Sequence, residues 1–322
     1  MRGIILLKIK QKLAIFFEFV ELRTKVASVF PMLAGFLWTY YRLGRFNWVN
    51  ASLFALAVLS FDMCTTAINN AVDYHKAVDL DYKTSENVIG VHQLDFGQMV
   101  RIIFGLLAFS VIVSLVIVSR TDVLLLVLGG LCFLIGIGYT YGPMPLSRLP
   151  LGEVFSGLTM GFGIFFLAVY MTAYDQLLWS RWTGGMVTIG WNWALTLELF
   201  CYSLPLVSLI AGIMLANNTC DLEVDIRNHR FTLVYYLGKA RALALYTGLQ
   251  VLPWLVLLGL ALTGRLPLWG LVTFAGLALH WPKVAAFRAK QVKRQTFVLS
   301  VQSFVLVASL YCAWLLLGIL LP

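Results

Sequence analysis

The sequence has few charged residues, since Asp, Glu, Lys and Arg make up 12% of its 322 positions, against about 25% in a typical soluble domain. It also lacks paired cysteines: its five Cys stand singly and form no Cys-x-x-Cys or other metal-binding spacing. Its four His form no zinc-binding set either. These absences argue against a soluble domain, a disulfide framework and a zinc centre.

Apolar residues are abundant instead, at 60% of the chain. A helix that crosses a membrane needs roughly 17–25 mostly apolar residues. The sequence predicts an all-α polytopic membrane protein with about nine such helices. They are expected at residues 26–42, 48–70, 99–119, 121–141, 152–174, 195–218, 242–263, 266–281 and 297–321.

Basic residues divide unevenly between the predicted connections. With the N-terminus in the cytoplasm, 19 of the 24 Lys and Arg fall on the cytoplasmic side, which agrees with the positive-inside rule. The net charge of +9 therefore reflects topology and does not indicate a nucleic-acid partner. We expect a multi-pass protein of the cell (plasma) membrane, in contact with the lipid bilayer.

One motif occurs twice. Asn-Asn-x-x-Asp is found at residues 69–73 and again at 217–221, each time at the predicted cytoplasmic end of an even-numbered helix. Four predicted helices separate the copies, which indicates two parallel four-helix repeats. The chain is thus expected to form one transmembrane domain over residues 1–322, with repeat halves at about 20–141 and 152–281 and a last helix at 297–321.

The spacing within each copy places its polar groups on one helix face. Asn69 and Asp73 are four residues apart, and Asn217, Asp221 and Asp225 continue one face for two turns. Carboxylate and amide oxygens suit Mg²⁺, which usually takes one or two carboxylates and completes its shell with water and substrate phosphates. The basic residues for the phosphates lie in the same cytoplasmic loops: Lys76, Arg148, Arg227, Arg230 and Lys239.

Two other interpretations of these residues stay open. Acids and amides just inside a membrane are often only solvated loop residues, although a matched second copy weakens that explanation. Parallel repeats with acidic residues are also found in transporters and channels. A transporter, however, is expected to carry its charges near the bilayer midplane, whereas here they lie at the inner boundary.

The two motifs resemble those of the UbiA superfamily of intramembrane prenyltransferases, approximately NDxxDxxxD and DxxxD. Here they read Asn-Asn-Ala-Val-Asp-Tyr-His-Lys-Ala-Val-Asp at residues 69–79 and Asn-Asn-Thr-Cys-Asp-Leu-Glu-Val-Asp at 217–225. Three further segments are most similar to the branch that prenylates 1,4-dihydroxy-2-naphthoate in menaquinone synthesis. They are Tyr-Thr-Tyr-Gly-Pro-Met-Pro-Leu at 139–146 with Gly-Glu at 152–153, Arg-Phe-Thr-Leu at 230–233, and Arg-Thr-Lys at 23–25.

The resemblance implies an enzyme that transfers a polyprenyl chain from polyprenyl diphosphate to an aromatic acceptor with Mg²⁺. It implies metal binding by Asn69, Asp73, Asp79, Asn217, Asp221 and Asp225, with Asp73, Asp221 and Asp225 as catalytic residues. Substrate contacts are expected from Asn69, Asn70, Lys76, Arg230, Lys25, Arg23, Tyr139 and Tyr141, although core packing is an equal alternative for the two tyrosines.

The resemblance leaves the acceptor open. Besides 1,4-dihydroxy-2-naphthoate, the ring could be 4-hydroxybenzoate, haem or another lipid-linked ring. The chain also departs from the family pattern, since Asn70 stands where the family has its first Asp and Ala77 where the strict motif has its third. Asn70 brings an oxygen but no charge, so one metal position is expected to be weaker or differently filled.

Overall fold

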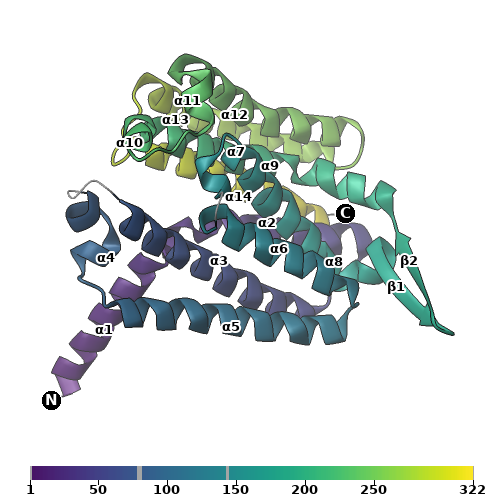
Figure 1. Ribbon diagram of the computed structural model, residues 1–322. Helices are drawn as coiled ribbons and strands as arrows, with labels where there is room; N and C mark the ends of the chain where they lie inside the picture. The colour runs from purple at the N-terminus through teal and green to yellow at the C-terminus, as the bar shows by residue number, and fades with distance from the viewer. Residues whose placement is uncertain (1, 78–81, 143–144, 322) are drawn as a thin grey trace.

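The computed structural model describes residues 2–77, 82–142 and 145–321, and over these ranges it is a bundle of helices with one two-stranded sheet (Figure 1). The expected ligand Asp79, and Pro143 and Met144 of the 139–146 segment, lie outside the described residues. The helices are α1 (Arg2–Phe19), α2 (Val26–Leu43), α3 (Trp48–Lys76), α4 (Val88–Val91), α5 (Phe96–Arg120), α6 (Leu124–Thr140), α7 (Gly152–Ser156), α8 (Ile164–Leu177), α9 (Trp193–Cys220), α10 (Leu222–Arg227), α11 (Leu233–Leu237), α12 (Lys239–Leu262), α13 (Leu277–Ala289) and α14 (Phe297–Leu320).

Helices occur within all the predicted ranges. In the described part of the chain, six helical stretches are long and apolar enough to cross a membrane: Trp48–Lys76, Phe96–Arg120, Gly152–Leu177, Trp193–Cys220, Lys239–Leu262 and Phe297–Leu320. The protein is therefore an integral membrane protein. Nine crossings in two repeats stay a prediction, because α6 is shorter and the range 266–281 divides into a 3-10 segment, Leu268–Gly276, followed by α13.

Helix α3 is longer than predicted. The sequence analysis ended this helix at residue 70 and assigned Asp73 to a loop, whereas the helix continues to Lys76. The backbone N–H of Ala77 still donates to the Asp73 carbonyl, and the last turn carries His75 and Lys76, basic residues that favour a helix C-terminus. The first motif therefore has fixed helical geometry.

A β-hairpin was not predicted. Strands β1 (Leu178–Thr183) and β2 (Met186–Trp191) pair antiparallel after α8. Gly184 and Gly185 form the turn with positive φ angles of 57° and 82°, which glycine adopts without strain. The Asp122 carboxylate attaches the hairpin to the α5–α6 connection, because it accepts hydrogen bonds from the Ser180 backbone N–H at 2.7 Å and hydroxyl at 2.9 Å.

Two acidic residues at the hairpin end of the bundle are paired with arginines. Figure 1 shows α4 and α10 at one end and the hairpin at the other. At the hairpin end, Glu198 is paired with both Arg42 and Arg265, and Asp175 is paired with Arg45. The acids of these pairs therefore have cationic partners.

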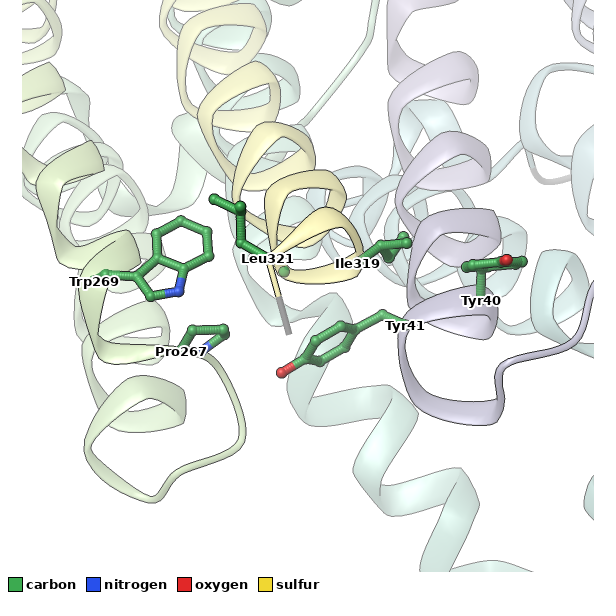
Figure 2. Close-up of a pocket in the computed structure, with 7 residues that line it drawn as sticks. Tyr40, Tyr41, Pro267, Trp269, Ile319 and Leu321 are labelled. Atoms are coloured by element: carbon green, nitrogen blue, oxygen red, sulfur yellow. The ribbon is translucent and has the colours of Figure 1, made fainter.

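An open pocket of about 490 Å³ lies at the ends of α2 and α14. Figure 2 shows Tyr41 of α2 pointing towards Pro267, with Trp269 beyond it and Leu321 at the end of α14. Its lining is aromatic and aliphatic, as is usual where a protein meets the membrane–water boundary. The pocket lies at the end of the bundle opposite the repeated motifs.

Two glycines bring α9 close to the segment between α7 and α8. A Cβ at Gly157 would lie 2.9 Å from the Val207 carbonyl oxygen, and one at Gly161 would lie 2.6 Å from the Val207 Cα. These glycines therefore allow close packing of the two helical segments. The segment Gly157–Gly163 is π-helical, a distortion frequently found next to functional sites.

A buried polar triad joins α12 to α13. The Trp254 indole N–H donates to His280 Nδ1 at 3.1 Å, so His280 Nε2 carries the proton and donates to Gln250 Oε1 at 3.0 Å.

We expect Trp254→Phe to lower the free energy of unfolding by about 1–2 kcal/mol, because the Nδ1 atom of His280 is left buried without a donor. Thermal unfolding in detergent measures this. Trp269→Phe is the matched control, and equal shifts for the two variants would contradict the role of the triad.

Candidate active site

The first motif forms the last turns of α3. Asn69 and Asp73 share a face as predicted, and the Asn69 side-chain amide donates to Asp73 Oδ2 at 3.2 Å. The Thr140 hydroxyl at the end of α6 donates to Asn69 Oδ1 at 3.2 Å. One face of α3 therefore presents an amide and a carboxylate whose positions are fixed by a neighbouring helix.

The second motif spans the junction of α9 and α10. The backbone N–H of Asp221 donates to the Asn217 carbonyl at 3.1 Å, and that of Asp225 to the Asp221 carbonyl at 2.7 Å. Helical hydrogen bonding therefore crosses the junction, and the predicted two-turn face is present. The Lys293 ammonium lies between Asn217 and Asp221 and donates to Asn217 Oδ1 and to Asp221 Oδ2.

The two motifs lie within electrostatic range of each other. The charges of Asp73 and Asp221 both act on Asp225, although Asp73 lies on α3 and Asp225 on α10. The basic side chains whose charges act on Asp73 come from separate segments of the chain: Arg230, Arg148, Lys76 and Lys293. The arrangement combines acids and amides from two segments with cations from four positions, as a site for a metal–diphosphate complex requires.

Asp225 is the most deeply buried carboxyl group of the second motif. It is 4% exposed, its Oδ1 pairs with Arg230 at 3.5 Å, and its Oδ2 has no partner among the described residues. Burial raises the pKa of Asp225 to about 6, with the Arg230 charge opposing the rise and Asp221 adding to it. An unpartnered buried carboxylate oxygen indicates a place for a cation.

The raised pKa of Asp225 predicts a pH-dependent affinity for Mg²⁺. A metal ion binds the ionised carboxylate, so below about pH 6 the proton competes with it and above about pH 7 the affinity levels off. For one proton, the dissociation constant is expected to rise up to about tenfold for each pH unit below 6. Calorimetric Mg²⁺ titrations at pH 5, 6, 7 and 8 measure this. A constant affinity from pH 5 to 7 would contradict it.

The donor set fits Mg²⁺ better than a transition metal. No group of three His, Cys, Asp or Glu side chains that could hold a metal ion occurs in the described ranges. The oxygens present come from carboxylates and amides, with Lys293 and Arg230 close to them. Such a mixed set suits an ion that keeps several waters and shares the phosphate oxygens of a substrate.

A family model for the UbiA prenyltransferase family matches residues 28–304. The chain belongs to that family. The resemblance to this family drawn from the sequence is confirmed.

Curated relatives and solved structures agree with this assignment. The 1,4-dihydroxy-2-naphthoate octaprenyltransferase of Bacillus subtilis (strain 168) is 24% identical over 268 residues, covering 81% of this chain and 78% of that protein. The protein of the same name from Mycobacterium tuberculosis is 25% identical over 233 residues, covering 70% and 71%. A UbiA homologue from Aeropyrum pernix K1 has a TM-score of 0.66 at 17% identity, covering 88% of this chain and 96% of that one.

A UbiA homologue from Archaeoglobus fulgidus bound to DMAPP and Mg²⁺ has a TM-score of 0.57 at 12% identity, covering 95% of this chain and 99% of that one. At these identities the two structural similarities show the fold alone.

Several expected substrate residues of this UbiA prenyltransferase have other contacts. The Asn70 side chain donates to the Phe19 carbonyl at the end of α1, at 2.9 Å, and so turns away from Asn69 and Asp73. Lys25 is 4% exposed and pairs with Asp62 at 2.7 Å. Arg23 is exposed on the segment before α2.

The two tyrosines of the 139–146 segment also differ from each other. The Tyr139 hydroxyl donates to Met214 Sδ at 3.4 Å, which places it between α6 and α9. Tyr141 is 63% exposed. The charge of Lys76 acts on Asp73, and its contact with substrate stays a prediction.

The sequence analysis missed Lys293. This side chain follows α13 in a run of basic residues that was used only to assign topology. Its contact with Asp221 spans 72 residues of chain, so nothing in the local sequence distinguishes it from Lys290 or Arg294. The sequence alone does not show that the 290–296 connection between α13 and α14 lies close to the second motif.

Proposed function

We propose that this enzyme transfers a polyprenyl chain from polyprenyl diphosphate to 1,4-dihydroxy-2-naphthoate, giving demethylmenaquinol, CO₂ and pyrophosphate. The observation that carries the proposal is the meeting of the two acid–amide motifs with Arg230, Lys293 and other cations at one end of the bundle. The names of the curated relatives support the acceptor.

The metal would be held by oxygens of both motifs. We assign this role to Asn69, Asp73, Asn217, Asp221 and Asp225, with Asp79 as a further ligand expected from the motif. Mg²⁺, when bound, neutralises the diphosphate and stabilises it as a leaving group. Arg230, Arg148, Lys76 and Lys293 would then bind the phosphate oxygens, where they stabilise the charge that develops on pyrophosphate.

The chain's own groups would orient the reacting carbon. With the diphosphate fixed between α3 and α10, the allylic carbon gains cation character as its bond to oxygen lengthens. The electron-rich ring then attacks that carbon, and loss of CO₂ from the ring restores aromaticity. Exclusion of water by the helix bundle favours attack by the ring over hydrolysis.

An apolar cavity supports a long prenyl tail. It has a volume of about 310 Å³ and lies between α3, α5, α6 and α8, with Phe61, Gly129, Phe133 and Leu167 in its lining. Phe61 is eight residues before Asn69 on α3, which is about 12 Å deeper in the bundle at 1.5 Å per residue. A tail that starts at the diphosphate would reach this cavity by following α3.

We further propose that the site faces the cytoplasm in the plasma membrane. The uneven distribution of Lys and Arg supports this orientation. Water-soluble naphthoate would then enter from the aqueous side, while the prenyl donor would arrive from the bilayer.

The test is a prenyl-transfer assay on purified protein. It contains polyprenyl diphosphates of several lengths, Mg²⁺ and 1,4-dihydroxy-2-naphthoate, with 4-hydroxybenzoate in parallel. We expect a demethylmenaquinol product that is lost with EDTA. Product from 4-hydroxybenzoate alone would refute the acceptor, and failure to bind any polyprenyl diphosphate with Mg²⁺ would refute the reaction.

A further inference from the structure

A second polar cluster lies beside the metal–diphosphate residues. Glu153, in the first turn of α7, is 3% exposed, and Asn218 of α9 is 2% exposed. The Asn218 side-chain amide donates to Glu153 Oε1 at 2.8 Å. Asn218 directly follows Asn217, whose own oxygen accepts from Lys293. The cluster therefore adjoins the second motif.

The remaining oxygens of this pair are orphaned. Glu153 Oε2 and Asn218 Oδ1 are both buried and have no hydrogen-bond partner within the described ranges. Burial of an oxygen acceptor without a donor costs about 1–3 kcal/mol, and more for a carboxylate. Two such atoms on hydrogen-bonded neighbours indicate that a ligand supplies the missing donors.

Glu153 also differs from the acids of the motifs. Asp221 pairs with Lys293 and Asp225 with Arg230, whereas Glu153 has no ion pair in the described part of the chain. A phosphate would be repelled by the carboxylate, so the diphosphate is a poor ligand here. Glu153 Oε2 and Asn218 Oδ1 can each accept a hydrogen bond, which suits the O–H of a neutral hydroxyl group.

The position lies between the two motifs. The charges of Glu153 and Arg230 both act on Tyr139, and a Cβ at Gly152 would lie 3.3 Å from the Tyr139 hydroxyl oxygen. Tyr139 precedes Thr140, which contacts Asn69 of the first motif. A ring held against Glu153 and Asn218 would therefore be close to the allylic carbon of a diphosphate bound by both motifs.

We propose that Glu153 and Asn218 form the subsite for a ring hydroxyl of the aromatic acceptor, and that Glu153 takes up the hydroxyl proton. This proposal rests on the proposed prenyl transfer. The O–H bond breaks and its proton passes to Glu153 Oε2, while the freed electron pair enters the ring. The ring carbon forms a bond to the allylic carbon, and the allylic C–O bond breaks with its electrons leaving on pyrophosphate.

The proton then returns. Loss of CO₂ leaves the carboxylate's bonding electrons in the ring, and the ring oxygen recovers its proton from Glu153. The ring regains its hydroxyl and the enzyme its starting state, so no external base or oxidant is needed. General-base assistance of this kind is typically worth about 10²–10⁴ in rate.

The first experiment compares Glu153→Gln with wild-type enzyme in steady-state prenyl transfer. We expect kcat/KM for 1,4-dihydroxy-2-naphthoate to fall at least about 100-fold, while the Mg²⁺-dependent dissociation constant for polyprenyl diphosphate stays within about twofold. Glu153→Asp, which keeps a proton acceptor, should recover part of the loss and restore the pH–rate profile. Glu198→Gln is the matched control, because Glu198 pairs with arginines at the opposite end.

A binding experiment separates this proposal from the reaction itself. Wild-type protein with Mg²⁺ and pyrophosphate should bind 1-hydroxy-2-naphthoate at least tenfold more tightly than 2-naphthoate, which lacks the hydroxyl. Glu153→Gln should lose most of that preference. The preference can be present even if neither ring is prenylated, so it would survive failure of the proposed function.

Three results would overturn the subsite. They are wild-type kcat/KM in Glu153→Gln, an undiminished preference for the hydroxyl in that variant, and a parallel loss of Mg²⁺ or diphosphate affinity. The last would assign Glu153 to the metal site, and the first two would leave an ordered water as the partner of the orphaned oxygens.

Discussion

The Asp73→Asn and Asp221→Asn variants are each expected to lower prenyl-transfer turnover by roughly a thousandfold, an effect at the upper end of that seen when one preorganised electrostatic contact is removed. Each variant keeps the side-chain shape but removes a full negative charge from one motif. The loss is expected in both turnover and Mg²⁺-dependent diphosphate binding, because in the proposed site these carboxylates hold the metal that binds the diphosphate.

The double variant is expected to fall little below the single ones. Asp73 and Asp221 lie on different helices, yet the charges of both act on Asp225. Residues that act as one unit give strongly non-additive losses, since the first substitution already disables the unit. Losses that multiply in the double variant would indicate two independent sites.

Folding is controlled in the same experiment. Asp175→Asn, which removes a surface ion pair with Arg45 at the other end, should keep wild-type activity. All variants are compared by size-exclusion profile and thermal unfolding in detergent. Near-wild-type activity in both the Asp73→Asn and Asp221→Asn variants would refute the site.

The repeated motif was predictable because its information is local. Four-residue spacing fixes a helix face regardless of what packs on it, so Asn69 and Asp73 were paired correctly from the sequence alone. The same argument predicted the face through Asp225. The helix end was placed too early because hydropathy falls where the motif begins, although the backbone continues as a helix to Lys76.

The partners of the motifs were not predictable in this way. Lys293 contacts Asp221 across 72 residues, and Asn218 contacts Glu153 across 65. Such contacts depend on how α9, α13 and α7 pack, and the spacing of residues within one motif does not show which distant helix packs against it. Polar residues at helix ends are frequent, so their types alone do not select the few that meet.

Lys25 is a residue for which the sequence suggested a role but did not show its contacts. The resemblance associated it with diphosphate, and its position at the start of α2 agreed with that role. In the structure its ammonium donates to Asp62 Oδ1 at 2.7 Å and to Thr66 Oγ1 at 2.6 Å, and the second Asp62 oxygen accepts from Ser28. A cation with this many acceptors is stabilised where it is, so its role in substrate binding stays a prediction.

Asn70 is the departure from the family pattern with the clearest structural reason. Its side-chain amide donates to the Phe19 carbonyl, and its backbone carbonyl accepts from the Asn87 side chain at 3.1 Å. A carboxylate cannot donate, so an Asp here would face a carbonyl oxygen with no proton between them. The side-chain amide therefore joins the end of α1 to α3, while the backbone of Asn70 holds Asn87, which precedes α4.

We accordingly expect Asn70→Asp to lower the free energy of local unfolding of α1 by about 3 kcal/mol, the cost of a lost hydrogen bond plus an unpaired charge. Amide hydrogen exchange at Phe16, Phe19 and Val20 should then accelerate by roughly 100-fold, since about 1.4 kcal/mol corresponds to a factor of ten. Asn70→Ala, which loses the donor without adding a charge, should show a smaller acceleration. Exchange is measured in detergent without substrate.

The same variant separates two roles for position 70. If Asn70 serves as a weakened metal ligand, Asn70→Asp should raise the affinity for Mg²⁺ and leave the exchange of α1 unchanged. If it holds α1, Mg²⁺ affinity should change less than about threefold while α1 exchanges faster. The side chain is directed at Phe19 and away from Asp73, so the second outcome is the one the contacts favour. The amide at position 70 then marks a place where this chain uses a motif residue for helix packing.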